Sequence, residues 1–230
     1  MKILKLINIA VLLFLGMHFL TAQNLKNQMD VVYGLSPILF NGKVYSDFYN
    51  NQVNSHQFLV AQTMVTGDIT VQNQLFTNHK LNLDIYKQKV LLEFQDQNKA
   101  VKIIEIPLEH LSKFSLENRH FIISKLDSFN YKIYQVIGDG NHQFQIHWFK
   151  KLETTSSASV YDYEFTDAKK EIILIQQGDI SQIVKNKSLI KSIKDIHQKK
   201  FKRWLKANRI KIHKATDSEL YLITQYLDHL

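Results

Sequence analysis

Alternating apolar and polar residues dominate the middle of the chain, and the pattern is clearest from Gly67 to Phe94. A period of two is typical of β-strands with one face in a core. The residues Tyr86-Lys87-Gln88-Lys89 interrupt the alternation and predict a turn. This stretch therefore predicts a β-hairpin whose apolar face is formed by Leu81, Leu83, Ile85, Val90, Leu92 and Phe94.

The same alternation of apolar and polar residues continues through most of the chain up to residue 184. Extended segments are predicted at 58–65, 69–72, 81–86, 90–95, 101–106, 113–116, 120–124, 131–137, 143–149, 161–165, 172–176 and 179–184. Gly138-Asp139-Gly140-Asn141 supplies the positive φ angles that a tight hairpin turn needs. About ten strands separated by short gaps predict a mainly β fold, an antiparallel meander curled into a half-barrel, a barrel or a sandwich.

The period changes to that of a helix after residue 187. Leu189, Ile190 and Ile193 recur at helical spacing, and a second helix is expected after Asp195 as its N-cap. The apolar side of this second helix is predicted to contain Ile196, Phe201, Trp204 and Leu205. Thr216 and Glu219 have the spacing of a capping box for a last helix. Two to three C-terminal helices are therefore expected to pack on the sheet.

The first residues have the pattern of a secretory signal peptide. Lys2 and Lys5 precede an apolar run, and Ala22 offers a small residue at the cleavage position. We expect a signal peptide at 1–22, a β-rich domain with an irregular leader at 23–184, and a basic helical segment at 185–230 packed on the same domain. An uncleaved N-terminal anchor is the alternative. The predicted location is the periplasm, or the outer membrane or cell surface as a peripheral protein.

Composition narrows the picture in two ways. The chain has no cysteine, so neither disulfides nor a lipid-bearing cysteine are expected. No later segment is apolar over a length that would span a bilayer as a helix, so the mature chain is expected to have no transmembrane span. Folding must then depend on core packing alone.

The positive charge is concentrated in one segment. The formal net charge is +8, and the segment 185–214 contains 12 Lys or Arg against one acid, Asp195. Basic residues beside Phe201 and Trp204 suggest contact with an anionic surface through Lys199, Lys202, Arg203 and Lys206. The partner would be an envelope protein, or an anionic lipid or lipopolysaccharide surface; nucleic acid is not expected for an exported protein. Alternatively, the aromatic residues are a core stripe and the lysines a solvated face.

Several stretches resemble a family of uncharacterised exported proteins from Bacteroidota. They are the leader Gly34-Leu35-Ser36-Pro37, the β-run from Gly67 to Phe94, the hairpin from Ile133 to Lys151, and the tail segments 187–190 and 202–208. The resemblance implies an envelope location and this fold, and it brings no site residues. Asp228-His229 departs from the Tyr-Asn expected near the end.

Specific catalytic or metal motifs do not stand out. His142 and His147 are five apart on a predicted strand and so lie on opposite faces. There is no G-x-S-x-G string, and Gly138-Asp139-Gly140 suits a hairpin turn better than a phosphate-binding loop. Asp84 and Glu93 are placed to face one another across the first hairpin, and we interpret them as a solvated sheet face. No cofactor or metal is predicted.

The sequence favours a non-enzymatic cell-envelope protein that acts as a binding or accessory module. One alternative is a carrier or chaperone that holds a lipid or acyl chain inside the curled sheet. A second alternative is a hydrolase whose site is not visible in the sequence. A large apolar pocket under the helices would favour the carrier, and a convergent polar trio in a groove would favour the enzyme.

Overall fold

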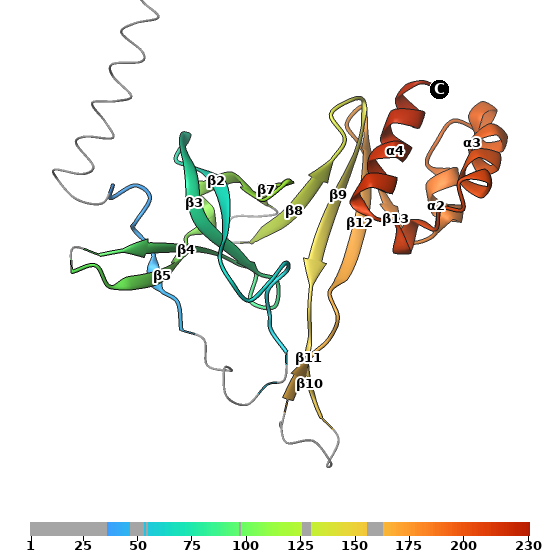
Figure 1. Ribbon diagram of the computed structural model, residues 1–230. Helices are drawn as coiled ribbons and strands as arrows, with labels where there is room; N and C mark the ends of the chain where they lie inside the picture. The colour runs from blue at the N-terminus through green and yellow to red at the C-terminus, as the bar shows by residue number, and fades with distance from the viewer. Residues whose placement is uncertain (1–35, 47–52, 54, 97, 126–129, 156–162) are drawn as a thin grey trace, which may run out of the picture.

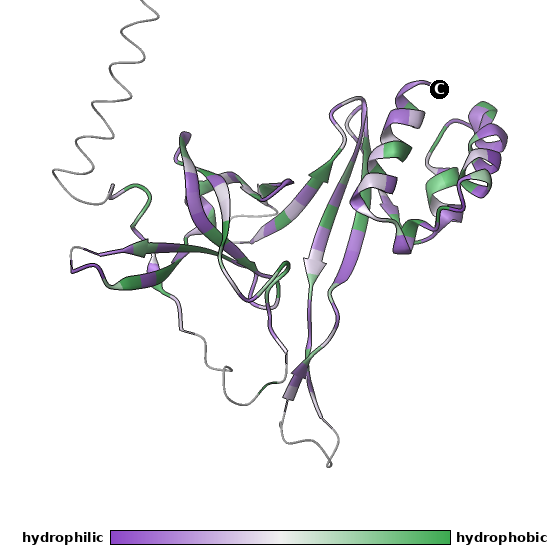
Figure 2. Cartoon of the chain, in the orientation of Figure 1, coloured by the Kyte–Doolittle hydropathy of each residue, from purple (hydrophilic) through white to green (hydrophobic). Residues whose placement is uncertain are grey.

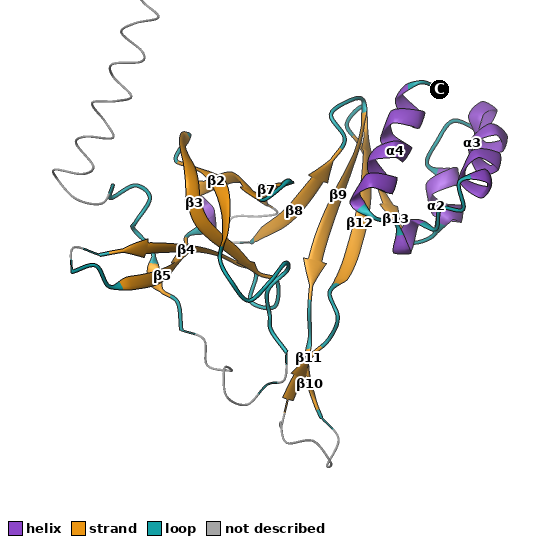
Figure 3. Ribbon diagram, viewed as in Figure 1, coloured by secondary structure: helices purple, strands orange, loops and turns teal. Residues whose placement is uncertain are grey.

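The computed structural model describes residues 36–230 except 47–52, 54, 97, 126–129 and 156–162 (Figure 1). Eleven strands of this part form one antiparallel sheet in the order β1-β5-β4-β3-β2-β6-β7-β8-β9-β12-β13. Two short strands, β10 and β11, pair as a separate ribbon. The predicted mainly β fold with C-terminal helices is confirmed (Figure 3).

The first half of the sheet contains seven strands. They are β1 (Lys43–Val44), β2 (Val65–Val71), β3 (Gln74–Asp84), β4 (Lys89–Gln95), β5 (Val101–Ile106), β6 (Leu111–Leu116) and β7 (Arg119–Lys125). The later strands are β8 (Tyr131–Ile137), β9 (His142–Phe149), β10 (Leu152–Thr154), β11 (Tyr163–Phe165), β12 (Lys169–Gln176) and β13 (Asp179–Ile183). A short 3-10 helix, η1 (Leu108–His110), precedes β6.

Three strand predictions need correction. Segment 58–65 is not a strand, because Phe58 makes only an isolated bridge to Asp84 and β2 begins at Val65. The strand predicted at 69–72 ends one residue early, because Gln72 and Asn73 have positive φ and form the turn to β3. No glycine marked this turn in the sequence. The strand predicted at 81–86 is the second half of β3, which begins at Gln74 and ends at Asp84. The short strands β1 and β10 were not predicted.

The sheet curls strongly but does not close into a barrel. Its edge strands, β1 and β13, lie at opposite ends of the strand order, and the first half curls away from the helices (Figure 1). Each half has its own apolar core. The first core includes Leu81, Leu92 and Phe121, and the second joins Phe144 and Ile146 to residues of the helices.

The predicted first hairpin is present, but Asn82 and Asp84 do not face solvent. Asp84 pairs with Lys89, and Glu93 pairs with Lys80, so the two acids are not opposite each other. Asp84 is 0% exposed because residues 57–59 and Tyr45 cover it. The interpretation of Asp84 and Glu93 as a solvated pair is therefore wrong for Asp84.

The helices cover strands β8, β9, β12 and β13. They are α2 (Asn186–Lys191), α3 (Asp195–Ala207), the 3-10 helix η2 (Ile212–Lys214) and α4 (Asp217–Asp228). The predicted capping box of α4 is confirmed, since Thr216 and Glu219 exchange hydrogen bonds. Asp195 is the first residue of α3 rather than its N-cap. Ile196, placed on the apolar side from the sequence, is 82% exposed.

A chain of polar contacts lies where the two cores meet. Trp148 packs against both cores, and its Nε1 donates a hydrogen bond of 2.7 Å to Oε1 of the buried Gln135. Gln135 Nε2 donates in turn to Asp217 Oδ2 at 2.8 Å, and Arg119 pairs with the same oxygen at 3.1 Å. This chain ties the start of α4 to strands β7, β8 and β9. We call these four residues the polar joint.

Candidate functional site: a basic pocket between α2 and α3

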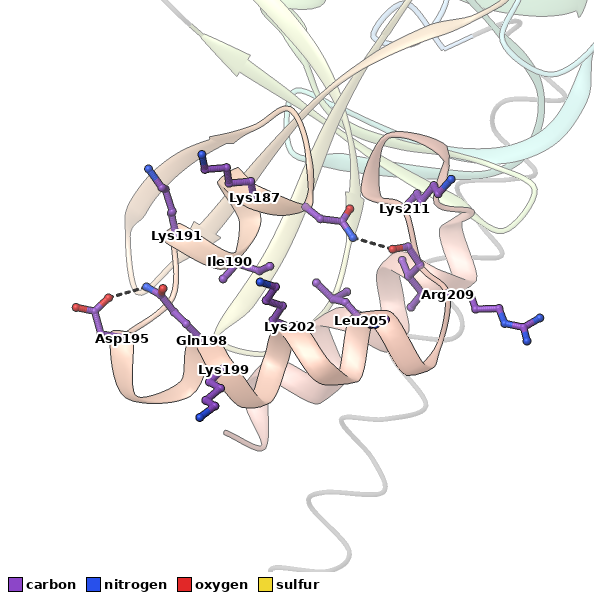
Figure 4. A pocket seen from close by; sticks show the side chains of 13 residues that line it. Lys187, Ile190, Lys191, Asp195, Gln198, Lys199, Lys202, Leu205, Arg209 and Lys211 are labelled. Carbon is purple, nitrogen blue, oxygen red and sulfur yellow. Dashed lines mark hydrogen bonds between the residues drawn. The ribbon is translucent and has the colours of Figure 1, made fainter.

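A pocket of about 1060 Å³ opens between α2, α3 and the segment that follows α3. We call it the basic pocket. Its lining residues are Asn186, Lys187, Ile190, Lys191, Asp195, Gln198, Lys199, Lys202, Leu205, Lys206, Arg209, Ile210 and Lys211. Seven of these thirteen residues are basic, and one is acidic. Figure 4 shows bases on the α2 side, along α3 and on the segment after α3.

Helical spacing decides which residues of α3 reach the pocket. Lys199, Lys202 and Lys206 are separated by three and four residues, so they share one face. Arg203 follows Lys202 by one residue, is exposed, and does not line the pocket. The structure thus brings three of the four predicted contact residues together and places Arg203 on another face.

The aromatic residues of α3 belong to the core and not to the pocket. Phe201 is 0% exposed, and Trp204 stacks on Tyr226 of α4 with ring centroids 4.3 Å apart. The alternative that Phe201 and Trp204 form a core stripe therefore holds. The apolar surface in the pocket comes from Ile190, Leu205 and Ile210 instead. Figure 2 shows α3 with hydrophilic residues along much of its length.

Four basic residues of the pocket were not singled out from the sequence. Lys187 and Lys191 come from α2, and Arg209 and Lys211 follow α3. The spacing of Lys187 and Lys191, four residues apart in a predicted helix, was the available signal. No sequence signal indicated that α2 would lie across from α3 with these lysines facing the same space.

None of the side chains of the seven bases forms a hydrogen bond or ion pair with a residue in the described part of the chain. Ion pairs between Lys or Arg and acids lie elsewhere: Lys89–Glu105, Lys102–Asp96, Arg119–Asp217 and Lys132–Glu171. The pocket's acid, Asp195, accepts a hydrogen bond of 2.6 Å from Gln198. The positive charge of the pocket is thus not neutralised by the described chain.

Both ends of the pocket are fixed by hydrogen bonds. At one end, Asn186 Nδ2 donates to the carbonyl of Ile210 at 2.7 Å, and the N–H of Ile212 donates to Asn186 Oδ1 at 2.8 Å. At the other end, Gln198 bonds both Asp195 and the carbonyl of Ile193. Backbone of α2, α3 and the segment after α3 therefore frames the pocket, which stays open on its outer side (Figure 4).

The histidines considered for a metal site have other contacts. His142 contacts Asp228 at 2.7 Å, and His147 Nδ1 lies 3.1 Å from the carbonyl of Ile133. They lie on opposite faces of β9, as predicted. No cluster of three metal-binding side chains occurs among the described residues. Asp228 thus has a defined contact in the β8–β9 hairpin.

Comparisons with known proteins give no relative from which a function could be transferred. No protein-family model matches the chain, and no curated protein or solved structure matches it either. The resemblance to exported proteins therefore stays a prediction. The predicted signal peptide at 1–22 lies outside the described residues. Within the described ranges, no helix has the length and apolarity to cross a membrane.

Proposed function

We propose that this protein is a non-enzymatic binding module of the cell envelope that binds the phosphate groups of anionic lipids with its basic pocket. The observation that carries the proposal is the set of seven exposed bases around one pocket, none of them paired within the described chain. Clustered bases attract anionic groups, and on a helix they repel one another. A ligand that supplies the missing negative charge would relieve this repulsion.

The two alternatives receive less support from the described residues. A carrier with its ligand inside the sheet needs accessible apolar surface there, but the side chains of the first core are buried and include Ile69, Leu81 and Leu92 at 0% exposure. A serine hydrolase in the basic pocket would need a serine nucleophile and a histidine base, and the lining residues include neither.

Vesicle binding tests the proposal. The protein is mixed with vesicles of phosphatidylglycerol or of phosphatidylcholine and sedimented at about 0.05 M and about 0.5 M salt. We expect binding to phosphatidylglycerol only, and its loss at high salt because screening weakens the attraction between exposed charges. The variant Lys199→Gln/Lys202→Gln/Lys206→Gln should lose this binding.

A soluble polyglutamate chain is the second arm of the same experiment. Binding to polyglutamate without binding to phosphatidylglycerol vesicles would contradict the lipid assignment and indicate an acidic protein partner. Equal, salt-insensitive binding by the wild type and the triple variant would contradict any role for these lysines.

A further inference from the structure

The apolar floor of the basic pocket lies deeper than its charges. Leu205 is 2% exposed and Ile210 is 4% exposed, whereas all seven bases are exposed. Ile190 is half-buried and completes the floor. The methylene stems of the lysines add further apolar surface above it. A ligand in the pocket therefore meets charges first, and the apolar surface below them belongs mainly to Ile190 and the lysine stems, because Leu205 and Ile210 are almost fully covered.

The pocket is open on its outer side, but its two ends are bounded, which limits what can reach this floor. The hydrogen bonds of Asn186 to Ile210 and Ile212 fix one end, and the turn between α2 and α3 forms the other. A flat bilayer surface would touch the lysines at the rim and leave the floor unused. A partner helix is about 10 Å wide and would have to cross these closed ends. A single compact molecule matches the shape better.

The arrangement of the bases suits an anion with several acceptor oxygens. Six of the seven bases are lysines, and Arg209 is the exception. The guanidinium of Arg matches carboxylate and phosphate alike, and Lys binds either one as a point charge, so the number and positions of the bases carry the argument and their type does not. Bases on two sides of the pocket also suit a phosphate, which carries up to two charges and several acceptor oxygens.

We infer that the basic pocket takes up one phosphorylated single-chain lipid at a time, with the phosphate between the lysines of α2 and α3 and the first methylenes of the chain against Ile190 and the methylene stems of the lysines. This inference rests on the proposed function and narrows it. Inorganic phosphate would contact only the exposed bases at the rim of the pocket, whereas this ligand would also contact the apolar surface of the floor. The protein would then hold a lipid molecule removed from the bilayer, and the pocket, not the interior of the sheet, would be the site of a carrier.

Calorimetric titration with dodecyl phosphate below its micelle concentration tests this inference, with inorganic phosphate and the uncharged dodecyl maltoside as comparison probes. Each buried methylene adds about 0.8 kcal/mol, so two or three should make dodecyl phosphate bind at least about tenfold tighter than inorganic phosphate. Dodecyl maltoside should bind more weakly than dodecyl phosphate, since it lacks the charge.

Two variants separate the rim from the floor. Ile190→Ser should weaken dodecyl phosphate binding several-fold and leave inorganic phosphate binding unchanged, because Ile190 is a half-buried floor residue. Lys202→Gln/Lys206→Gln should weaken both phosphate probes. A control, Lys200→Gln/Arg203→Gln, removes two charges from α3 outside the pocket and should weaken neither.

The outcomes also separate this inference from the proposed function. Equal affinity for dodecyl phosphate and inorganic phosphate, lost in Lys202→Gln/Lys206→Gln, would overturn the single-lipid inference and leave anion binding in place. Equal affinity for dodecyl phosphate and dodecyl maltoside would overturn the role of the phosphate. Absence of binding by both phosphate probes and by phosphatidylglycerol vesicles would overturn both proposals.

Discussion

The surroundings of Asp84 in the first hairpin and the basic pocket both contain ionisable side chains. In the first region the side chain is buried and hydrogen-bonded, and in the second the side chains are exposed and unpaired. Asp84 is fully buried, and its two oxygens accept hydrogen bonds from the backbone of Tyr86 and Lys87 and from the hydroxyl of Tyr45. The bases of the basic pocket are exposed and have no such partners in the described chain. A buried group whose hydrogen-bond partners are all internal holds the fold together, whereas unpaired exposed charges are available to a ligand.

The largest expected effect on stability follows from removing the internal partners of Asp84. Asp84→Ala deletes three hydrogen bonds in a buried place and should lower the free energy of unfolding by about 3 kcal/mol. Urea denaturation measures this change. Asp84→Asn keeps an acceptor oxygen for the two backbone N–H groups and is the matched control. An alanine variant as stable as the asparagine variant would contradict a structural role for these bonds.

The polar joint should give the next effect. Trp148→Phe removes the indole N–H and leaves Oε1 of the buried Gln135 without this donor, at a cost of about 2 kcal/mol in unfolding free energy. Trp204→Phe is the control, because Trp204 stacks on Tyr226 and makes no hydrogen bond through its indole N–H within the described chain. Equal losses in the two variants would indicate that packing, not the hydrogen bond, matters at Trp148.

A pH dependence sharpens the contrast at Asp84. Burial raises the pKa of the Asp84 carboxyl above its ordinary value of 3.8, although the hydrogen bonds from Lys87, Tyr45 and Tyr86 act in the other direction. The folded protein therefore holds this proton more tightly than the unfolded chain. The stabilisation that this more tightly held proton gives to the folded state is fully present below pH 3.8, and it is lost as the pH rises through the raised pKa of Asp84.

The asparagine variant isolates this effect, since it has no proton to lose. The unfolding free energy of the wild type minus that of Asp84→Asn should fall as the pH rises through this window. Urea denaturation across a pH series from below 3.8 to neutral measures it. A difference that rises with pH would mean that the hydrogen bonds outweigh burial and that the pKa is lowered.

The smallest expected effect on stability belongs to the basic pocket. Lys202 and Lys206 are like charges four residues apart on α3, and such pairs destabilise a helix by about 0.2–0.5 kcal/mol. Lys202→Gln/Lys206→Gln should therefore leave the melting temperature unchanged or raise it slightly. A clear drop in the melting temperature would show that these lysines stabilise the fold, and the pocket would then resemble the surroundings of Asp84.

The sequence predicted the strands and the basic segment of these two regions, but it did not predict the contacts between segments that are distant in the chain. Period-two alternation located most strands, but it could not show that residues 57–59 return to cover Asp84. The turn at Gln72-Asn73 was missed because its positive φ angles fall on residues other than glycine. On α3, composition identified the basic segment, and spacing alone would have separated Arg203 from Lys202. The contribution of α2 depends on how the helices pack, which local patterns do not encode.

The most direct test of the account compares two double variants that remove the same charge from α3. Binding to phosphatidylglycerol vesicles at about 0.05 M salt is measured for Lys202→Gln/Lys206→Gln, whose changes lie in the pocket, and for Lys200→Gln/Arg203→Gln, whose changes lie outside it. The account predicts a loss of about tenfold or more for the first variant and wild-type binding for the second, at about 1 kcal/mol for each base in contact. Equal losses in both would show that only the overall charge of the helix matters, and would contradict a role for the pocket.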